Sequence, residues 1–502
     1  MNIRDRLTHG FFYIFSGRVG AGLLTVIVTP IIVRVLGSGG YGDYAFALAV
    51  YSALRTVAGG GTYEGARKYI AEKAMGAEQE TIFYYYLKVA ALFGTVAASL
   101  LVVATYLFVG RLILDPHLRP YLYIVAGMVF FHSFYHLIRS SLMGYNLEEY
   151  SEPLYVLNRV FFPLIGIPLA LVGWHVAGLL VGHLLSTVLI VLIGYGALLR
   201  YTSVTLRSPV ELVPRPAIFH SRMFRYGMLN VVFVLTTKSL YVTDILLLKP
   251  FVESEEVGYY NAALVAAEFL WFVPMALQVV LLHSASALWA AGREDDITEM
   301  ASTITRYTLL MTGTIAVVLA TVGDAFLPVY FGAEFAVSYL PMLLLLPGVV
   351  AFAVARPIYA IGQGHGNMRV LVLATGSAAV LNLVGNLLLI PPFGMHGAAV
   401  ATSIGYGSMV IFHILTARHL GFYPLQDVPL FRIVVTCLVP LPVFVFVYDL
   451  IGVPLLGMIM IPLLALPAFV VLARQLDVIS DREWSESKAL ARRRLQGGEN
   501  NE

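Results

Sequence analysis

Long apolar runs follow one another along the whole chain, and they constrain its fold more than any other feature. A helix needs about 20 mainly apolar residues to cross the hydrocarbon core of a bilayer. The composition fits such a solvent, since 59% of the residues are hydrophobic and 12% are charged, against about 25% charged in soluble domains. The runs lack the alternation of barrel strands. We therefore expect an all-α polytopic membrane protein with about 14 transmembrane helices, over residues 11–36, 41–62, 82–110, 120–144, 153–173, 176–200, 223–249, 259–283, 303–328, 337–361, 369–391, 395–417, 430–448 and 452–473.

The basic residues indicate how the chain is oriented. Lys and Arg are retained on the cytoplasmic side during insertion. With the N-terminus inside, about 23 of the 32 basic residues fall on one side and about four on the other, these four being Arg34, Arg111, Arg119 and Lys249. We expect a multi-pass protein of the cell membrane with both termini cytoplasmic.

A polar segment and two internal echoes predict the domain organisation. TSVTLRSPVELVPRPAIFHSR divides the first twelve predicted spans into two groups of six. YGDYAFALAVYSAL resembles VGYYNAALVAAEFL, which aligns Gly42 with Gly258 and Tyr44 with Tyr260, and GWHVAGLLVG resembles GMHGAAVATS. Such repeats build many transporters, with the substrate pathway between the halves. We predict an N-terminal lobe at 1–201, a cytoplasmic linker at 202–222, a C-terminal lobe at 223–418, two appended helices at 419–473 and a cytoplasmic polar tail at 474–502.

Sequence motifs for chemistry are missing from the chain. It contains no Walker loop, zinc-helix signature, nucleophile elbow or dinucleotide fingerprint. Its single cysteine, Cys437, cannot form an intrachain disulfide or a cysteine-based metal site. We expect a transporter and not an enzyme, with no catalytic residues, metal or cofactor. Transport would then be driven by a proton or sodium gradient or by the substrate's own free-energy difference.

Five basic residues fall inside predicted spans, where ionisable groups are costly and normally face a cavity or a partner. They are Arg18, Arg55, Lys88, Arg159 and Lys238, and four of them belong to the N-terminal half. A vestibule lined by such cations would concentrate an anionic head group, and the planar fork of Arg suits phosphate. We predict that these five residues bind substrate. The alternative interpretation is snorkelling, in which a long side chain carries its charge to the interface.

Two acids and two histidines also lie within predicted spans. Asp244 and Glu268 are candidates for coupling to a driving ion, since carboxylates at membrane depth commonly act as relays. The alternative is that one of them neutralises Lys238. His132 and His136 have i, i+4 spacing and therefore share a helix face. Two histidines without a third ligand make a poor metal site, which favours hydrogen-bonding core residues.

Specific strings then resemble a known family across nearly the whole chain. IIVRVLGSGGYGDYAFALAV, VGYYNAA, FGAEFAVSYLPMLLLLPG and GQGHGNMRVLVLATGSAAVLNLVGNLLLIPPFGMHGAAVATSIGY are similar to the polysaccharide-export and oligosaccharide flippase family. The resemblance implies the multidrug/oligosaccharidyl-lipid/polysaccharide exporter fold, in which two six-helix lobes surround a central cavity, often with two further helices. The matching strings consist mostly of turn and packing residues, and we expect Gly37, Gly42, Gly394 and Gly397 to allow tight turns or close helix approach.

The activity that the resemblance implies is lipid flipping. The cargo would be a polyprenyl- or dolichyl-phosphate- or pyrophosphate-linked oligosaccharide, moved from the cytoplasmic to the outer leaflet by alternating access for cell-surface polysaccharide or glycoprotein synthesis. Expected partners are this glycan, membrane lipids, and glycosyltransferases or a polymerase, with no nucleic acid.

Three alternatives remain beside this function. A multidrug exporter of the same fold should have an acidic and aromatic cavity, which the five basic residues argue against. A peptidoglycan-precursor flippase also prefers a basic cavity, so charge does not separate it from the favoured function. A membrane-embedded glycosyltransferase or polymerase would need a long extramembrane loop with acidic catalytic residues, and the predicted outer loops are short.

Overall fold

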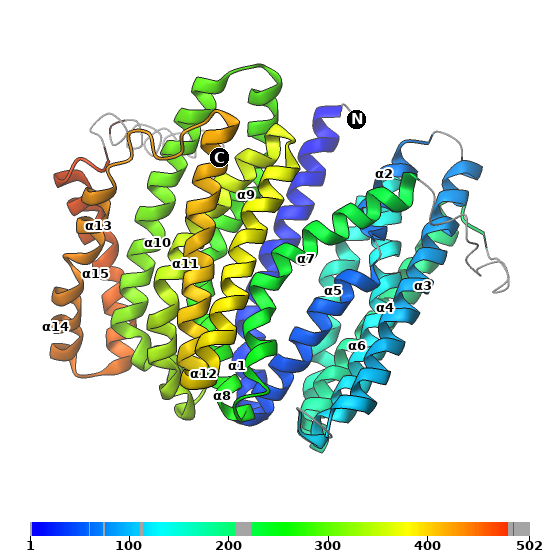
Figure 1. The fold of residues 1–502 in the computed structure, drawn as a ribbon, viewed down its shortest axis with the longest axis horizontal. Coiled ribbons are helices and arrows are strands. Elements are labelled where there is room, and N and C mark those ends of the chain that lie inside the picture. The colour runs from blue at the N-terminus through cyan, green and yellow to red at the C-terminus, as the bar shows by residue number, and fades with distance from the viewer. Residues whose placement is uncertain are drawn as a thin grey trace, which may run out of the picture. The chain divides into compact units, whose positions relative to one another are not determined.

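The protein is built almost entirely from helices (Figure 1). The computed structural model describes residues 3–59, 61–73, 76–110, 114–205, 222–479 and 485. Within these residues there is no β-strand beyond an isolated bridge between Val109 and Leu114. The α-helices are α1 (Ile3–Ala58), α2 (Thr62–Ala71), α3 (Gly76–Phe108), α4 (Arg119–Gly144), α5 (Glu148–Leu169), α6 (His175–Tyr201), α7 (Arg222–Leu248), α8 (Ser254–Glu268), α9 (Phe272–Ala290), α10 (Glu294–Phe331), α11 (Tyr339–His365), α12 (Met368–Leu420), α13 (Leu430–Leu438), α14 (Leu441–Ile451) and α15 (Pro454–Gln475).

The helices have the length and the surface of membrane spans. Ten helical stretches within the described ranges are long and apolar enough to cross a bilayer. Large apolar side chains on them are exposed, among them Leu388 and Leu466, each 68% exposed, and Phe446, 67% exposed. Soluble monomers rarely expose wide apolar surfaces of this kind. The chain is therefore an all-α polytopic membrane protein, while the number of 14 spans stays a prediction.

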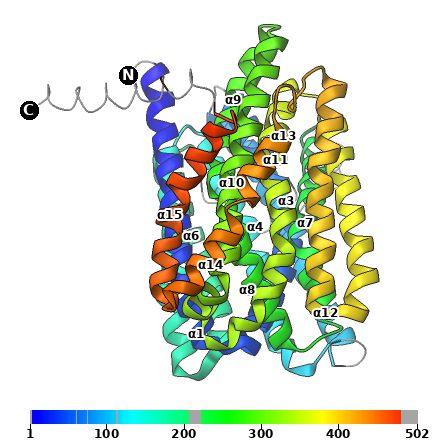
Figure 2. The ribbon, with the colours of Figure 1, turned by 90° about the vertical axis from the view of Figure 1, so that its left-hand side faces the viewer.

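Glycines with positive φ break several of these stretches. The helix α1 is interrupted at Gly37 (φ 67°) and α12 at Gly394 (φ 53°), a conformation that glycine adopts without steric cost. Figure 1 shows the two arms of α1 running in opposite directions from the break, and Figure 2 shows α12 as a hairpin. The turns expected at Gly37 and Gly394 are therefore confirmed.

The chain divides into two compact units, each with its own core. The first unit comprises residues 1–261 and 386–398. Its main core joins α2, α3, α4, α5 and α6 through buried apolar side chains, including Ala66, Phe83, Leu137, Leu154 and Ile190. In this unit α1 packs against α3, α4, α5, α6 and α7, so α1 lies where five other helices meet.

The second unit comprises residues 262–385 and 399–502. One of its cores joins α9, α10, α11 and α12 through residues such as Ala285, Ile297 and Ile358. A second core attaches α13, α14 and α15 to α10, and in it Val317 and Val322 pack with Phe444 and Phe469.

One predicted span differs locally from the structure. The run at 430–448 is divided into α13 and α14 by a turn at residues 439 and 440. Pro440 lacks the backbone N–H that would continue the helix. The lobe boundaries at 201 and 223 and the central cavity stay predictions, and the linker at 202–222 and the tail at 474–502 lie largely outside the described residues.

Candidate functional site

Basic and imidazole side chains gather in the first unit at the packing of α1 with α4, α5 and α6. We call this set the basic cluster, and it consists of Arg55 on α1, Arg159 on α5, His132 and His136 on α4, and His183 on α6. Two of these five residues, Arg55 and Arg159, are substrate-binding candidates from the sequence. Because α1 contacts all three other helices, the fold places side chains that are distant in sequence side by side.

The two arginines lie over tyrosine rings of their own helices. The Arg55 guanidinium carbon is 5.4 Å from the centroid of the Tyr51 ring, and that of Arg159 is 5.7 Å from the centroid of the Tyr155 ring. Both charges act electrostatically on His132 and on His183, so they belong to one neighbourhood. Within the described residues, no carboxylate lies within ion-pair distance of Arg55 or Arg159. The cluster therefore has positive charge available to an anion.

The histidines are held by tyrosines and by one another. The Tyr51 hydroxyl lies 2.7 Å from His132 Nδ1, and the Tyr44 hydroxyl lies 2.8 Å from His183 Nε2. The rings of His132 and His136 meet edge to face with centroids 4.4 Å apart, which confirms that they share a helix face. His132 is 6% exposed, and its Nε2 has no hydrogen-bond partner.

A buried ion pair that was not predicted from the sequence borders the cluster. Arg139 Nη2 lies 3.1 Å from Glu152 Oε1, and Arg139 Nε donates to the carbonyl oxygen of Ser151 at 3.2 Å. The Arg139 guanidinium also faces the rings of Tyr135 and Tyr155. Since Glu152 neutralises Arg139, this pair adds little net charge, and it fixes α4 against α5.

The other predicted substrate-binding residues have separate surroundings. Arg18 belongs to α1, and its side chain lies outside the described part of the structure. Lys88 is half-buried on α3, and Lys238 is half-buried on α7 with its Nζ 5.6 Å from the centroid of the Tyr241 ring. Their role in binding stays a prediction.

The two candidate ion-coupling acids each accept a hydrogen bond from a tyrosine. Asp244 is fully buried, and its Oδ2 accepts from the Tyr260 hydroxyl. Glu268 is half-buried, and its Oε1 lies 3.5 Å from the Tyr406 hydroxyl. Tyr260 is the residue that the internal repeat aligns with Tyr44, so both repeat tyrosines contact a titratable side chain. Coupling at these acids stays a prediction.

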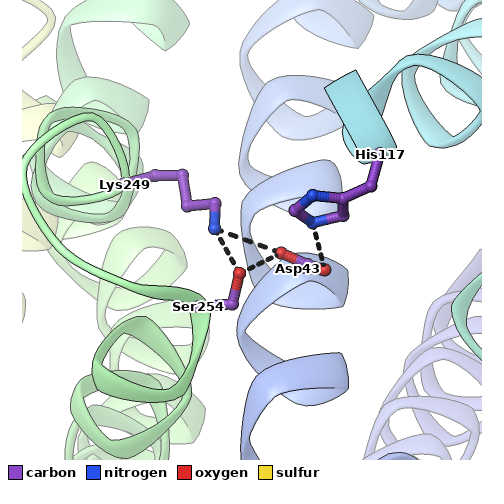
Figure 3. Close-up of polar contacts among 4 residues, drawn as sticks. All are labelled: Asp43, His117, Lys249 and Ser254. Carbon is purple, nitrogen blue, oxygen red and sulfur yellow. Dashed lines mark hydrogen bonds and ion pairs between the residues drawn. The ribbon is translucent and has the colours of Figure 1, made fainter. Parts of the chain in front are cut away.

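A second polar group lies near the start of the arm of α1 that follows Gly37, whereas Arg55 lies near the end of that arm. Figure 3 shows this group. We call it the Asp43 network. Asp43 Oδ1 lies 3.2 Å from Lys249 Nζ and accepts from the Ser254 hydroxyl at 2.6 Å, and Asp43 Oδ2 lies 2.9 Å from His117 Nε2. The side chains of Lys249 and Asp43 are 2% and 9% exposed. Lys249 is one of the four basic residues predicted on the outer side, and its pairing with Asp43 was not predicted from the sequence.

The repeat glycines lie beside this network. A Cβ atom on Gly42 would collide with the carbonyl oxygen of Ser254, and one on Gly258 would collide with the carbonyl oxygen of Ser38. The two glycines thus allow reciprocal backbone contact between α1 and α8. This confirms that Gly42 permits close helix approach, and it explains why the two echoed strings share a glycine at this position.

The second unit has a buried cation of its own. Arg356 on α11 is 8% exposed, and its guanidinium carbon lies 4.5 Å from the Trp271 ring centroid and 4.7 Å from that of Phe352. With the N-terminus inside, the span predicted at 337–361 ends on the cytoplasmic side, and Arg356 lies near that end. Among the described residues, no group of three His, Cys, Asp or Glu side chains is placed to hold a metal.

Comparison with known proteins decides the family. The model of the polysaccharide biosynthesis protein family matches residues 7–281. The chain belongs to this family. The matched region includes every residue of the basic cluster and of the Asp43 network.

Relatives of this family member include named flippases. It is 24% identical over 369 residues to an uncharacterized membrane protein of Methanocaldococcus jannaschii, covering 69% of this chain and 70% of the relative. It is 24% identical over 427 residues to the probable flippase AglR of Haloferax volcanii, covering 81% and 82%. It is 26% identical over 208 residues to the probable low-salt glycan biosynthesis flippase Agl15 of the same organism, covering 40% and 42%.

Solved structures show the same fold. The lipid II flippase MurJ in an inward closed conformation superposes with a TM-score of 0.74 at 12% identity, covering 92% of this chain and 97% of MurJ. An inward-facing multidrug resistance transporter of the MATE family superposes with a TM-score of 0.64 at 15% identity, covering 79% and 94%. The family member therefore shares the fold of these two solved structures.

Proposed function

We propose that this protein is a flippase that moves a polyprenyl- or dolichyl-phosphate- or pyrophosphate-linked oligosaccharide from the cytoplasmic to the outer leaflet by alternating access. Membership of the polysaccharide biosynthesis protein family and the flippase names of AglR and Agl15 support it. We further propose that it acts in the cell membrane, with both termini cytoplasmic, beside the glycosyltransferases or the polymerase that make and use the glycan.

The basic cluster is the observation that carries this proposal. Arg55 and Arg159 lie in one electrostatic neighbourhood without an acidic partner among the described residues. Their charge suits a phosphate, because a guanidinium makes paired, charge-assisted hydrogen bonds to phosphate oxygens. The same cations would repel the lipophilic cations that a multidrug exporter carries. We propose that Arg18, Lys88 and Lys238 extend this binding surface.

A flipping assay in proteoliposomes tests the proposal. The substrate is a fluorescent oligosaccharide linked to polyprenyl pyrophosphate, and transfer between leaflets is followed by chemical quenching from outside. Each charge-assisted hydrogen bond contributes about 1.5–3 kcal/mol. We therefore expect the Arg55→Gln, Arg159→Gln double variant to lose at least about tenfold in transport rate at low substrate concentration.

Arg200→Gln is the matched control for the double variant. Arg200 is exposed like Arg159, and its guanidinium carbon also lies 5.7 Å from a tyrosine ring centroid, that of Tyr201. It lies in the last turn of α6, outside the basic cluster. Transport by the double variant equal to that of the control would contradict the proposed phosphate contact.

A further inference from the structure

The histidines of the basic cluster have a polar arrangement that phosphate binding by arginine does not require. Three imidazoles lie among two cations, and two of them are hydrogen-bonded to tyrosine hydroxyls. Histidine is the side chain whose charge ordinarily changes between about pH 5 and pH 8. A histidine that only filled space would need no hydrogen bond, and an apolar residue could take its place.

We propose that His132, His136 and His183 form a proton-binding site linked to the anion site, so that an anionic phosphate and protons bind to the cluster together. The inference rests on the proposed phosphate contact of Arg55 and Arg159 and deepens it. Proton uptake is the only chemical step: each imidazole takes one proton at a ring nitrogen, and no covalent bond to the ligand forms.

The linkage follows from the charges. Burial disfavours a proton on these imidazoles, and the neighbouring guanidinium groups repel it as well. A phosphate bound between the guanidinium groups offsets that repulsion and attracts the proton. Because linkage is reciprocal, protons then strengthen phosphate binding by the same factor.

The hydrogen bonds accommodate both charge states. A tyrosine hydroxyl is both a donor and an acceptor, whereas a protonated imidazole donates from both nitrogens. The contacts of Tyr51 with His132 and of Tyr44 with His183 therefore persist when the proton arrives, with the imidazole nitrogen as the donor whichever group donated before. The buried Nε2 of His132 has no partner, so in the protonated ring its N–H is available to an incoming anion.

Four helices contribute titratable or charged neighbours of the histidines. The groups that touch them or act on them electrostatically are Tyr44, Tyr51 and Arg55 from α1, Tyr63 from α2, Tyr135 and Arg139 from α4, and Arg159 from α5. Glu152, the carboxylate of the ion pair that borders the cluster, is held by Arg139. An anion in the cluster would therefore meet net positive charge.

Calorimetry on the detergent-solubilised full chain tests the inference, with farnesyl pyrophosphate as the probe. Binding is measured between about pH 8 and pH 6, in buffers of different ionisation enthalpy, which reports the protons taken up. As the pH is lowered, we expect the dissociation constant of the probe to fall up to about tenfold per pH unit for each linked proton. In the His132→Gln, His136→Gln double variant this pH dependence and the buffer-dependent heat should decrease. If the double variant does not fold, the measurement is repeated on the two single variants.

His413→Gln is the control, because His413 is a buried histidine on α12 that lies 3.2 Å from the Thr375 hydroxyl and edge-on to Tyr359. The protonation of farnesyl pyrophosphate itself contributes equally in the native chain and in all the variants. Binding with the same proton uptake in the native chain and the histidine variants would overturn the inference and leave the phosphate contact standing. No binding by the native chain at any pH would overturn both, and binding lost only on Arg55→Gln, Arg159→Gln replacement would support the phosphate contact separately.

Discussion

At the scale of single residues, the Asp43 network shows how much the energetic cost of a buried charge depends on its ionic partner. Lys249 and Asp43 are almost fully buried, and each is the other's ionic partner. Removing two charges from water is costly, so a pair of this kind contributes little net stability as a pair, whereas a single remaining charge is strongly unfavourable. The stability of this end of α1 therefore depends on the two residues jointly.

A double-mutant cycle tests that dependence. We expect Lys249→Met or Asp43→Asn alone to destabilise the protein by about 3–5 kcal/mol, and the double variant to cost less than the sum of the two. Thermal unfolding in detergent measures each free energy. His117→Gln is the milder comparison, because the His117 side chain is 48% exposed. Additive losses in the cycle would show that the pair is not coupled.

Asp244 allows a second test at this scale, of the proposed ion coupling. Asp244→Asn keeps an acceptor for the Tyr260 hydroxyl but cannot carry charge. If Asp244 binds the driving ion, transport in proteoliposomes should no longer accelerate under a proton or sodium gradient. Asp324→Asn is the control, because Asp324 accepts from the Tyr448 hydroxyl at 3.0 Å. Gradient-dependent transport in both variants would exclude Asp244 as the coupling group.

At the scale of helices, the apolar runs predicted the elements well, since hydrophobic length is a property of consecutive residues. Which side chains meet was harder to predict. His183 and the pair of Arg139 with Glu152 were missed, because their partners come from other helices and depend on packing. The pairing of Asp43 could have been predicted in part from the sequence. Asp43 follows Gly42 in the repeated string, and Lys249 ends a span that was predicted to reach the same side of the membrane.

The contact of Gly42 with α8 gives a prediction for these elements. In Gly42→Ala the new methyl group would collide with the Ser254 carbonyl, and overpacking of this kind costs at least about 1–3 kcal/mol. Gly407→Ala on α12 meets open space and should be neutral or stabilising by up to about 1 kcal/mol. Thermal unfolding compares the two variants. Equal stability of both would mean that α1 and α8 do not approach as closely as the structure has them.

At the scale of the whole molecule, alternating access requires contacts that form in one state and break in another. The contact of α1 with α8 joins strings that the internal repeat relates, and it lies at the end of the second arm of α1 remote from Arg55. Under the proposed topology this is the outer end. If, as proposed, a cargo enters at the basic cluster from the cytoplasm, we predict that it leaves outward only after this contact has opened.

A reversible cross-link tests whether the contact opens during transport. A Cβ atom on Gly39 would lie 3.7 Å from Glu255 Cγ, so cysteines at these two positions would be near neighbours. In a Cys437→Ala background, we expect oxidised Gly39→Cys, Glu255→Cys protein to bind farnesyl pyrophosphate but not to transport the glycolipid, and reductant to restore transport. Each single cysteine variant, oxidised in the same way, is the control. Native transport by the fully cross-linked protein would show that the cycle proceeds with α1 and α8 in contact, and the exit route would then have to lie elsewhere.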